Sequence, residues 1–159
     1  MVARLRTALV ALLIAVPGLA ACSDDDSTDD STDDYITRVS RICTQVEREL
    51  SGLESTRVES RRERAALIDD VIATSRDAVR RLKAIEPPGG DDGETAKRFV
   101  STLEREVDND AVPALEDLRD AVISGDPRAA DNAGARLRRL ERSKSDRYAR
   151  ALGANACAA

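Results

Sequence analysis

The sequence predicts an all-α protein, an antiparallel up-down-up-down four-helix bundle over residues 35–159 that is closed by one disulfide. Apolar residues recur three and four positions apart through four successive segments, which is the spacing of one face of a helix. No segment alternates apolar and polar residues as a half-buried strand would. The three connections between the segments are short, and short connections favour antiparallel neighbours.

The first helix is expected to begin at Asp33 or Asp34, because a carboxylate at that position can cap the free backbone N–H groups. Ser51-Gly52 marks its predicted end. Cys43 lies on the apolar face, so its thiol should point into the bundle. The residues of this face are Ile36, Val39, Cys43, Val46, Leu50 and Leu53.

The second helix has two candidate starts, Thr56 with Glu59 and Ser60 with Glu63, since each pair fits a capping box. The segment Pro87-Pro88-Gly89-Gly90 should end this helix, because proline cannot continue it and glycine favours a turn. Its apolar stripe comprises Leu67, Ile68, Val71, Ile72, Ala78, Val79, Leu82 and Ile85.

The third helix covers Ala96 to Val122 and contains Pro113. Proline should kink this helix, or restart it with Asp110 as a local cap. Residues 124–127, Ser-Gly-Asp-Pro, then provide a glycine to end one helix, a carboxylate to cap the next and a proline for its first position. The fourth helix is expected to continue without a break until Gly153 ends it.

The first 21 residues are predicted to be a cleaved signal peptide. Arg4 and Arg6 precede an apolar run at residues 8–16. That run is shorter than the roughly 20 residues that span a bilayer, and it fits a secretory signal. It leads to Leu19-Ala20-Ala21-Cys22, which resembles the bacterial lipobox at every position. The resemblance implies a lipid on the Cys22 thiol, and ordinary secretion with a free thiol is the alternative.

Residues 22–34 are expected to form a disordered acidic tether, because residues 23–34 contain only serine, threonine and aspartate and have nothing to bury. Seven of the 30 acidic residues lie there, and two of the 25 basic residues precede it. The domain from Tyr35 onward therefore holds 23 residues of each sign. Such a balanced domain has no long-range field to attract nucleic acid, so we expect no nucleic-acid partner.

Cys43 and Cys157 remain as an even pair once Cys22 carries lipid, in a compartment where disulfides persist. The start of the first helix and the end of the fourth share a pole in the predicted bundle, so we expect a disulfide there. Two separate buried thiols are the alternative. Closing a loop of about 114 residues would stabilise the fold by up to roughly 4–5 kcal/mol. Two thiols without any histidine cannot complete a zinc site, so no metal is expected.

No catalytic set is recognisable in the sequence. The chain lacks histidine, the commonest general base, and it has neither a nucleophile elbow nor a phosphate-binding glycine loop. We therefore expect neither an enzyme nor a cofactor. The carboxylates that fall mainly off the apolar stripes are expected on solvated faces: Glu47, Asp69, Asp77, Glu104 and Glu116.

Two clusters of charge lie on successive predicted helices. The third helix is acidic from Glu104 to Asp120, and the fourth is basic from Arg136 to Arg150. Antiparallel neighbours would lay the clusters side by side, so ion pairs within the bundle are expected. The sharper alternative is a membrane-facing patch, in which Arg147 and Arg150 contact anionic headgroups at the pole nearest the tether.

The whole pattern resembles the small helical lipoproteins and secreted proteins of actinobacteria. They often pair a cysteine in the first helix with one near the C-terminus after a glycine, here Cys43 and Cys157 after Gly153, and the stretch from Leu82 to Pro88 is also similar. The resemblance implies a helical fold anchored outside the cell membrane and supplies no activity.

The expected function is a non-enzymatic module that binds a protein or a component of the cell envelope. A small-ligand carrier with a cavity between helices is the alternative. The predicted core of alanine, leucine, valine and isoleucine suggests no obvious ligand pocket, and this expectation favours the first of the two functions.

Replacing Cys22 with alanine should release the protein from membranes, because the thiol that carries the lipid is lost. Detergent phase partition should move this variant into the aqueous phase. The Cys43→Ala/Cys157→Ala variant, which keeps Cys22, should stay with the detergent. Retention of Cys22→Ala in the membrane fraction would contradict lipid attachment at this residue.

Overall fold

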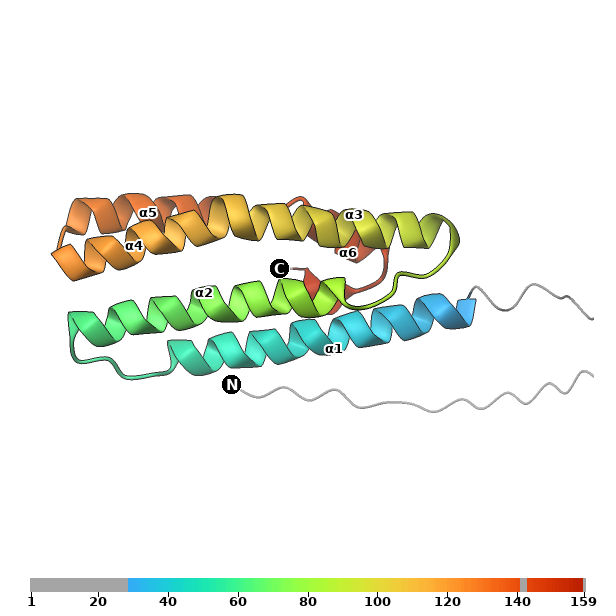
Figure 1. Cartoon of the computed structure of the whole chain (residues 1–159), viewed down its shortest axis with the longest axis horizontal. Coiled ribbons are helices and arrows are strands. Elements are labelled where there is room, and N and C mark those ends of the chain that lie inside the picture. Colours follow the sequence, from blue (N-terminus) through green and yellow to red (C-terminus); the bar gives the residue numbers. More distant parts are fainter. Residues whose placement is uncertain (1–28, 141–142, 159) are drawn as a thin grey trace, which may run out of the picture.

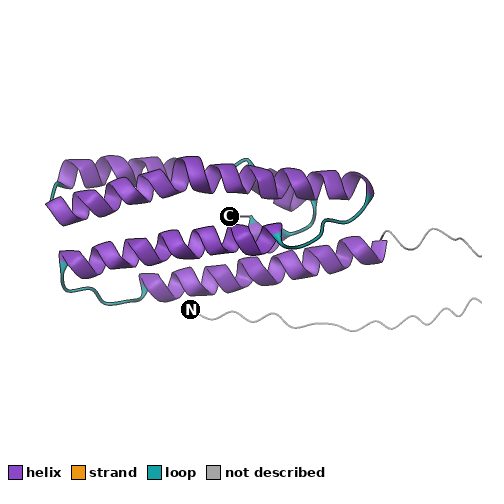
Figure 2. Cartoon of the chain, viewed as in Figure 1, coloured by secondary structure: helices purple, strands orange, loops and turns teal. Residues whose placement is uncertain are grey.

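The computed structural model describes residues 29–140 and 143–158, and every regular element in those residues is a helix (Figure 1, Figure 2). The predicted all-α class is confirmed. Four uninterrupted helices are not observed, because the third contains a π-helical turn and the fourth is broken. The elements are α1 (Asp29–Glu54), α2 (Arg61–Lys83), α3 (Gly90–Glu106), the π turn η1 (Val107–Ala111), α4 (Val112–Ser124), α5 (Pro127–Arg139), α6 (Ser145–Ala151) and the 3-10 turn η2 (Asn155–Cys157).

Helix α1 begins at Asp29, earlier than the predicted start at Asp33 or Asp34. Acidic residues stabilise a first helical turn because the helix dipole places partial positive charge there. Asp34 also pairs with Arg38 one turn later, at 3.6 Å. The acidic run therefore continues as helix from Asp29 onward. The remaining tether and the signal segment lie outside the described residues.

Helix α2 begins at the second of its two predicted starts. The Ser60 hydroxyl accepts the Glu63 N–H at 3.1 Å, and the Glu63 carboxylate accepts the N–H groups of Ser60 at 3.0 Å and Glu59 at 2.7 Å. These backbone donors favour the carboxylate and lower the pKa of Glu63. The alternative start at Thr56 is wrong, since its hydroxyl donates to the Gly52 carbonyl at 3.2 Å.

Pro113 is the second residue of α4, just after η1, and Asp110 does not cap that helix. The residue before α4, Ala111, has helical backbone angles and makes no side-chain cap. The N–H of Val112 bonds to the carbonyl of Val107, five residues back. Proline lacks an N–H and its ring collides with the carbonyl four residues earlier, and a widened π turn relieves both problems. Figure 1 shows that α3, η1 and α4 continue as one rod.

The predicted stop and start at residues 124–127 is confirmed. Gly125 ends α4 at φ +74°, a left-handed conformation that favours glycine. The Asp126 carboxylate caps α5 by accepting the N–H groups of Arg128 at 2.9 Å and Ala129 at 3.1 Å.

The predicted fourth helix is broken between α5 and α6, which is a correction. Ser143 and Asp146 cap each other, with Ser143 Oγ accepting the Asp146 N–H at 3.2 Å and donating to its carboxylate at 2.7 Å. Glu106, at the end of α3, accepts the N–H groups of Lys144 at 2.6 Å and Ser145 at 3.4 Å, and the Ser145 hydroxyl at 2.6 Å. The free donors at the start of α6 therefore find acceptors, and a new helix begins there.

The helices form two layers (Figure 1). Helices α1 and α2 lie side by side in one layer, and the rod of α3, η1 and α4 lies in the other. The layers meet mainly through α2 and α4. Helix α5 packs on α4, and α6 packs on α3. The chain after Gly125 thus returns along the rod in two pieces.

The buried core is divided into two clusters. The smaller cluster joins α2 to α4 through Ile68, Ile72 and Val112. The larger cluster lies where α1, α2, α3 and α6 meet, and it contains the fully buried Val39 and Phe99. The second half of α1 contributes no buried residue to either cluster, although Ile42 and Cys43 pack against the larger one. The members of the larger cluster are Tyr35, Val39, Leu82, Ile85, Ala96, Phe99, Ala149, Leu152 and Ala154.

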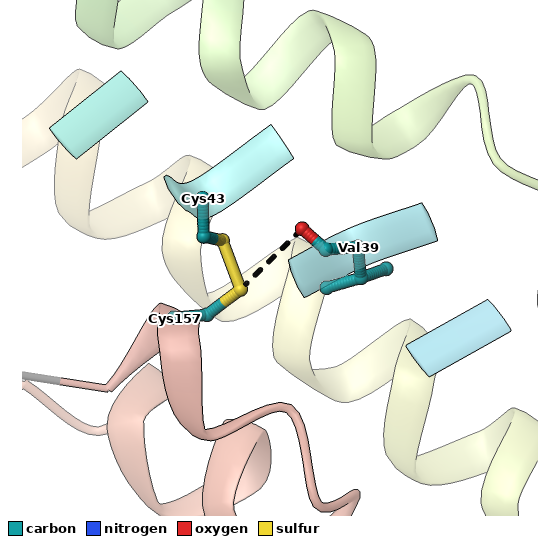
Figure 3. The surroundings of a disulfide bond; sticks show 3 residues. All are labelled: Val39, Cys43 and Cys157. Atoms are coloured by element: carbon teal, nitrogen blue, oxygen red, sulfur yellow. Dashed lines mark hydrogen bonds between the residues drawn. A yellow bond between two sulfur atoms is a disulfide. The ribbon is translucent and has the colours of Figure 1, made fainter. Parts of the chain in front are cut away.

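The expected disulfide joins Cys43 to Cys157, with sulfurs 2.02 Å apart and Cα atoms 5.2 Å apart (Figure 3). It does not lie at the pole where α1 begins. Cys43 is about 21 Å along the helix from Asp29, at a rise of about 1.5 Å per residue. The Cys157 sulfur also lies 3.8 Å from the Val39 carbonyl oxygen. That approach is a packing contact, because a bonded sulfur carries no hydrogen.

The expected pairing of the acidic and basic clusters is realised at one ion pair among the described residues, Arg136 with Asp117. Three further ion pairs within the described chain join the rod to α2 instead. Those pairs are Lys83 with Glu104 at 2.5 Å, Arg76 with Glu116 at 3.7 Å and Arg119 with Asp69 at 3.1 Å. All are partly exposed, so each contributes little to stability.

The Cys43→Ala/Cys157→Ala variant should lose about 2–5 kcal/mol of unfolding free energy, because its unfolded chain is no longer constrained by the cross-link. Urea denaturation measures the difference, and non-reducing mass mapping of the parent protein should recover the linked peptides. Cys22→Ala, which leaves the disulfide intact, should unfold at the parent urea concentration. Free thiols at both cysteines in the parent protein would rule out the cross-link.

Candidate functional site

A groove of about 700 Å³ runs beside the second half of α1. One wall is formed by α1 and α2, and the other by the junction of α3 with η1. The C-terminal residues 155–158 close one end, next to the disulfide. Apolar side chains dominate its lining, which comprises Ile42, Cys43, Val46, Glu47, Leu50, Ser51, Glu54, Ser75, Ala78, Val79, Leu82, Leu103, Val107, Asn155, Ala156, Cys157 and Ala158.

The groove exists because the apolar face of α1 is longer than the structure that covers it. The main neighbours of α1 among the described residues are α2 and η2. Helix α6 begins beside Glu106 and runs toward the first half of α1, and α5 packs against α4. Val46 and Leu50, which continue the apolar face beyond Cys43, are therefore only half-buried. A continuous fourth helix would run along α3, η1 and α4, whereas the observed chain is interrupted between α5 and α6.

The groove has few polar side chains, and they differ in whether they have a hydrogen-bond or ion-pair partner. Ser75 is half-buried, and its hydroxyl donates to the Val71 carbonyl at 2.9 Å on its own helix. Glu47 and Glu54 are exposed and make no hydrogen bond or ion pair within the described residues. Within residues 29–140 and 143–158, no lysine or arginine lines the groove. The groove is thus an apolar surface bordered by two unpaired carboxylates.

A second hollow, of about 230 Å³, lies between α2 and α3 and includes Tyr35 from α1. The ion pair of Lys83 with Glu104 is among its lining residues. Burial raises the pKa of the Tyr35 phenol, because the charged form would lose solvation. This space falls below the roughly 300–1,000 Å³ of ordinary ligand sites, so the larger groove is the better candidate.

The predicted site residues fall into separate places. Cys43 and Cys157 are bonded to each other and lie at one end of the groove. Arg147 and Arg150 are exposed on α6, which packs against α3 near the larger core cluster. Their contact with a membrane stays a prediction. Cys22 lies outside the described residues.

Four of the five carboxylates expected on solvated faces form ion pairs. Asp77 pairs within α2, and the other three pair with a residue of another helix. Glu47 is the exception, since it lies in the groove lining without a partner in the described chain. The other four are Asp69, Asp77, Glu104 and Glu116.

The groove itself was not predicted from the sequence. The useful sign was the length of the α1 stripe, which extends through Leu50 and Leu53, beyond the level of Cys43. A second sign was the Ser143-x-x-Asp146 pattern, a helix-start signature inside a segment that otherwise shows helical spacing.

Comparison of the chain with family models, curated proteins and solved structures gives no match. Within residues 29–140 and 143–158, no helix has both the length and the apolar character that are needed to cross a bilayer. The same residues contain no group of three or more potential ligands that could hold a metal ion.

A pair of valine substitutions on α1 tests whether the groove is open. Val39→Ala should cost about 2 kcal/mol of unfolding free energy, since it removes buried methyl groups and leaves a cavity in packed surroundings. Val46→Ala makes the same chemical change beside the groove and should cost less than about 1 kcal/mol. Urea denaturation measures both. Equal, large losses would mean that Val46 is packed and that the groove is filled in solution.

Proposed function

We propose that this chain is a lipid-anchored, extracytoplasmic binding protein without enzymatic activity, and that its groove binds a small apolar or amphipathic ligand. The apolar groove of about 700 Å³ carries the proposal. Its size falls within the roughly 300–1,000 Å³ of small-molecule sites, and its lining is mainly apolar with a few polar groups, as such sites require. The signal segment and Cys22 support the proposed location.

A protein-binding module is the second candidate function. Docking surfaces for proteins are usually marked by an exposed apolar patch of several hundred Å². Among the described residues, the one large apolar side chain that is strongly exposed is Ile123, at 59%. The apolar surface available for binding is therefore concentrated in a concave site, which favours a small ligand over a protein partner.

The fold is proposed to act as one antiparallel up-down-up-down bundle whose third rod is α3–η1–α4 and whose fourth rod is the pair α5 and α6. The packing of α1 on α2, of α5 on α4 and of α6 on α3 supports this description. In such a bundle, the interruption of the fourth rod leaves space for a ligand site, so no inserted segment is needed to form one.

Photo-crosslinking tests the proposed site in the lipidated protein, reconstituted in nanodiscs of zwitterionic phospholipid. A neutral, straight-chain alcohol with a diazirine group should label peptides from residues 42–54 and 155–158. Ala78→Phe, which places a ring in the groove, should reduce that labelling by about fivefold or more. Ala73→Phe is the matched control, because Ala73 is an exposed residue of α2 outside the lining. Equal labelling of both variants would overturn the proposal.

A further inference from the structure

We infer that the groove selects amphiphiles with a cationic head, meaning a single aliphatic chain that ends in an amine or a quaternary ammonium group. The inference rests on the proposed function and names the class of ligand for the same site. Three properties of the groove carry it: its charge, its dimensions and the placement of its carboxylates.

The charge of the lining is negative in the part of the chain that the structure describes. Among those residues, Glu47 and Glu54 are the ionisable side chains of the lining apart from the bonded cysteines, and the lining includes no basic residue. Basic residues elsewhere on these helices are engaged or lie outside the lining. Arg81 of α2, for example, donates to Gln45 at 2.6 Å and pairs with Asp77 at 3.6 Å. A cationic head would supply a partner for a carboxylate that has none among the described residues.

The length of the groove suits a single extended aliphatic chain. The lining residues of α1 extend from Ile42 to Glu54, a length of about 18 Å at about 1.5 Å per residue. An aliphatic chain can lie along this length against the apolar side chains of the lining.

Glu54 lies at the end of the groove opposite the disulfide, and Glu47 lies about one helical turn beyond Cys43. Cys43 and the C-terminal residues close one end, whereas Glu54 is the last residue of α1 at the other. Glu47 lies two turns before Glu54, on the same side of the helix because seven residues make almost two complete turns. An aliphatic chain pointing toward Cys43 would therefore place its head beside Glu54, in contact with water, with Glu47 about two turns of α1 further along the chain.

A chain-matched set of three photoreactive amphiphiles tests the selectivity in the nanodisc-anchored protein. The probes share one diazirine-bearing alkyl chain and carry a trimethylammonium, a hydroxyl or a sulfate head. The Glu47→Gln/Glu54→Gln variant should lose groove labelling by the ammonium probe by roughly twofold to fivefold, since the exposed ion pair of the head is removed. Its labelling by the alcohol should be unchanged, and labelling by the sulfate should rise.

The control variant is Glu49→Gln/Glu86→Gln, which changes net charge equally at two exposed residues outside the lining. It should label as the parent protein does with all three probes. Because each probe is compared between variants in identical nanodiscs, differences in membrane partition cancel. If the alcohol labels the groove but the ammonium probe is insensitive to Glu47 and Glu54, the charge selectivity is wrong and the proposed binding function stands. If none of the probes labels the groove, both are wrong.

Discussion

The carboxylate of Glu106 determines where the last part of the chain lies. By accepting two backbone N–H groups and a hydroxyl at the start of α6, it fixes that helix against the end of α3. The position of α6 in turn brings Ala149 and Leu152 into the larger core cluster and delivers Cys157 to Cys43. The groove lies beside the part of α1 that α6 does not reach, since α6 begins beside Glu106 and runs toward the first half of α1, where Ala149 and Leu152 pack with Tyr35 and Val39.

Local rules of sequence predicted those parts of the fold that local interactions determine. The capping box of Ser60 with Glu63 and the turn at Gly125 are set by residues within one helical turn. The turn was predicted, and the capping box was one of the two predicted starts. The break before α6 depends in addition on Glu106, which lies 38 residues before Lys144. Apolar spacing continues across that break, so periodicity alone indicated one helix. Pro113 was recognised as a disturbance, but the π turn that accommodates it was not.

The candidate site was harder to predict than the fold for a related reason. A stripe such as Val46, Leu50 and Leu53 has the same spacing whether a neighbouring helix covers it or a groove lies beside it. Glu47 was correctly expected on an accessible face, yet its significance depends on walls contributed by α2, η1 and the C-terminal residues. Sequence spacing shows which face is apolar. It does not show how far along that face the packing extends.

The position of the disulfide also determines when the groove is completed. Residues 155–158, which close one end of the groove, follow the last helix and are held to α1 by the bond between Cys157 and Cys43. On the proposed route through the membrane, the chain leaves a reducing compartment and forms that bond only after translocation. The end wall of the groove is then secured outside the cell, so an amphiphile in the cytoplasm never meets the finished site. Oxidation would thus mark the moment at which binding begins.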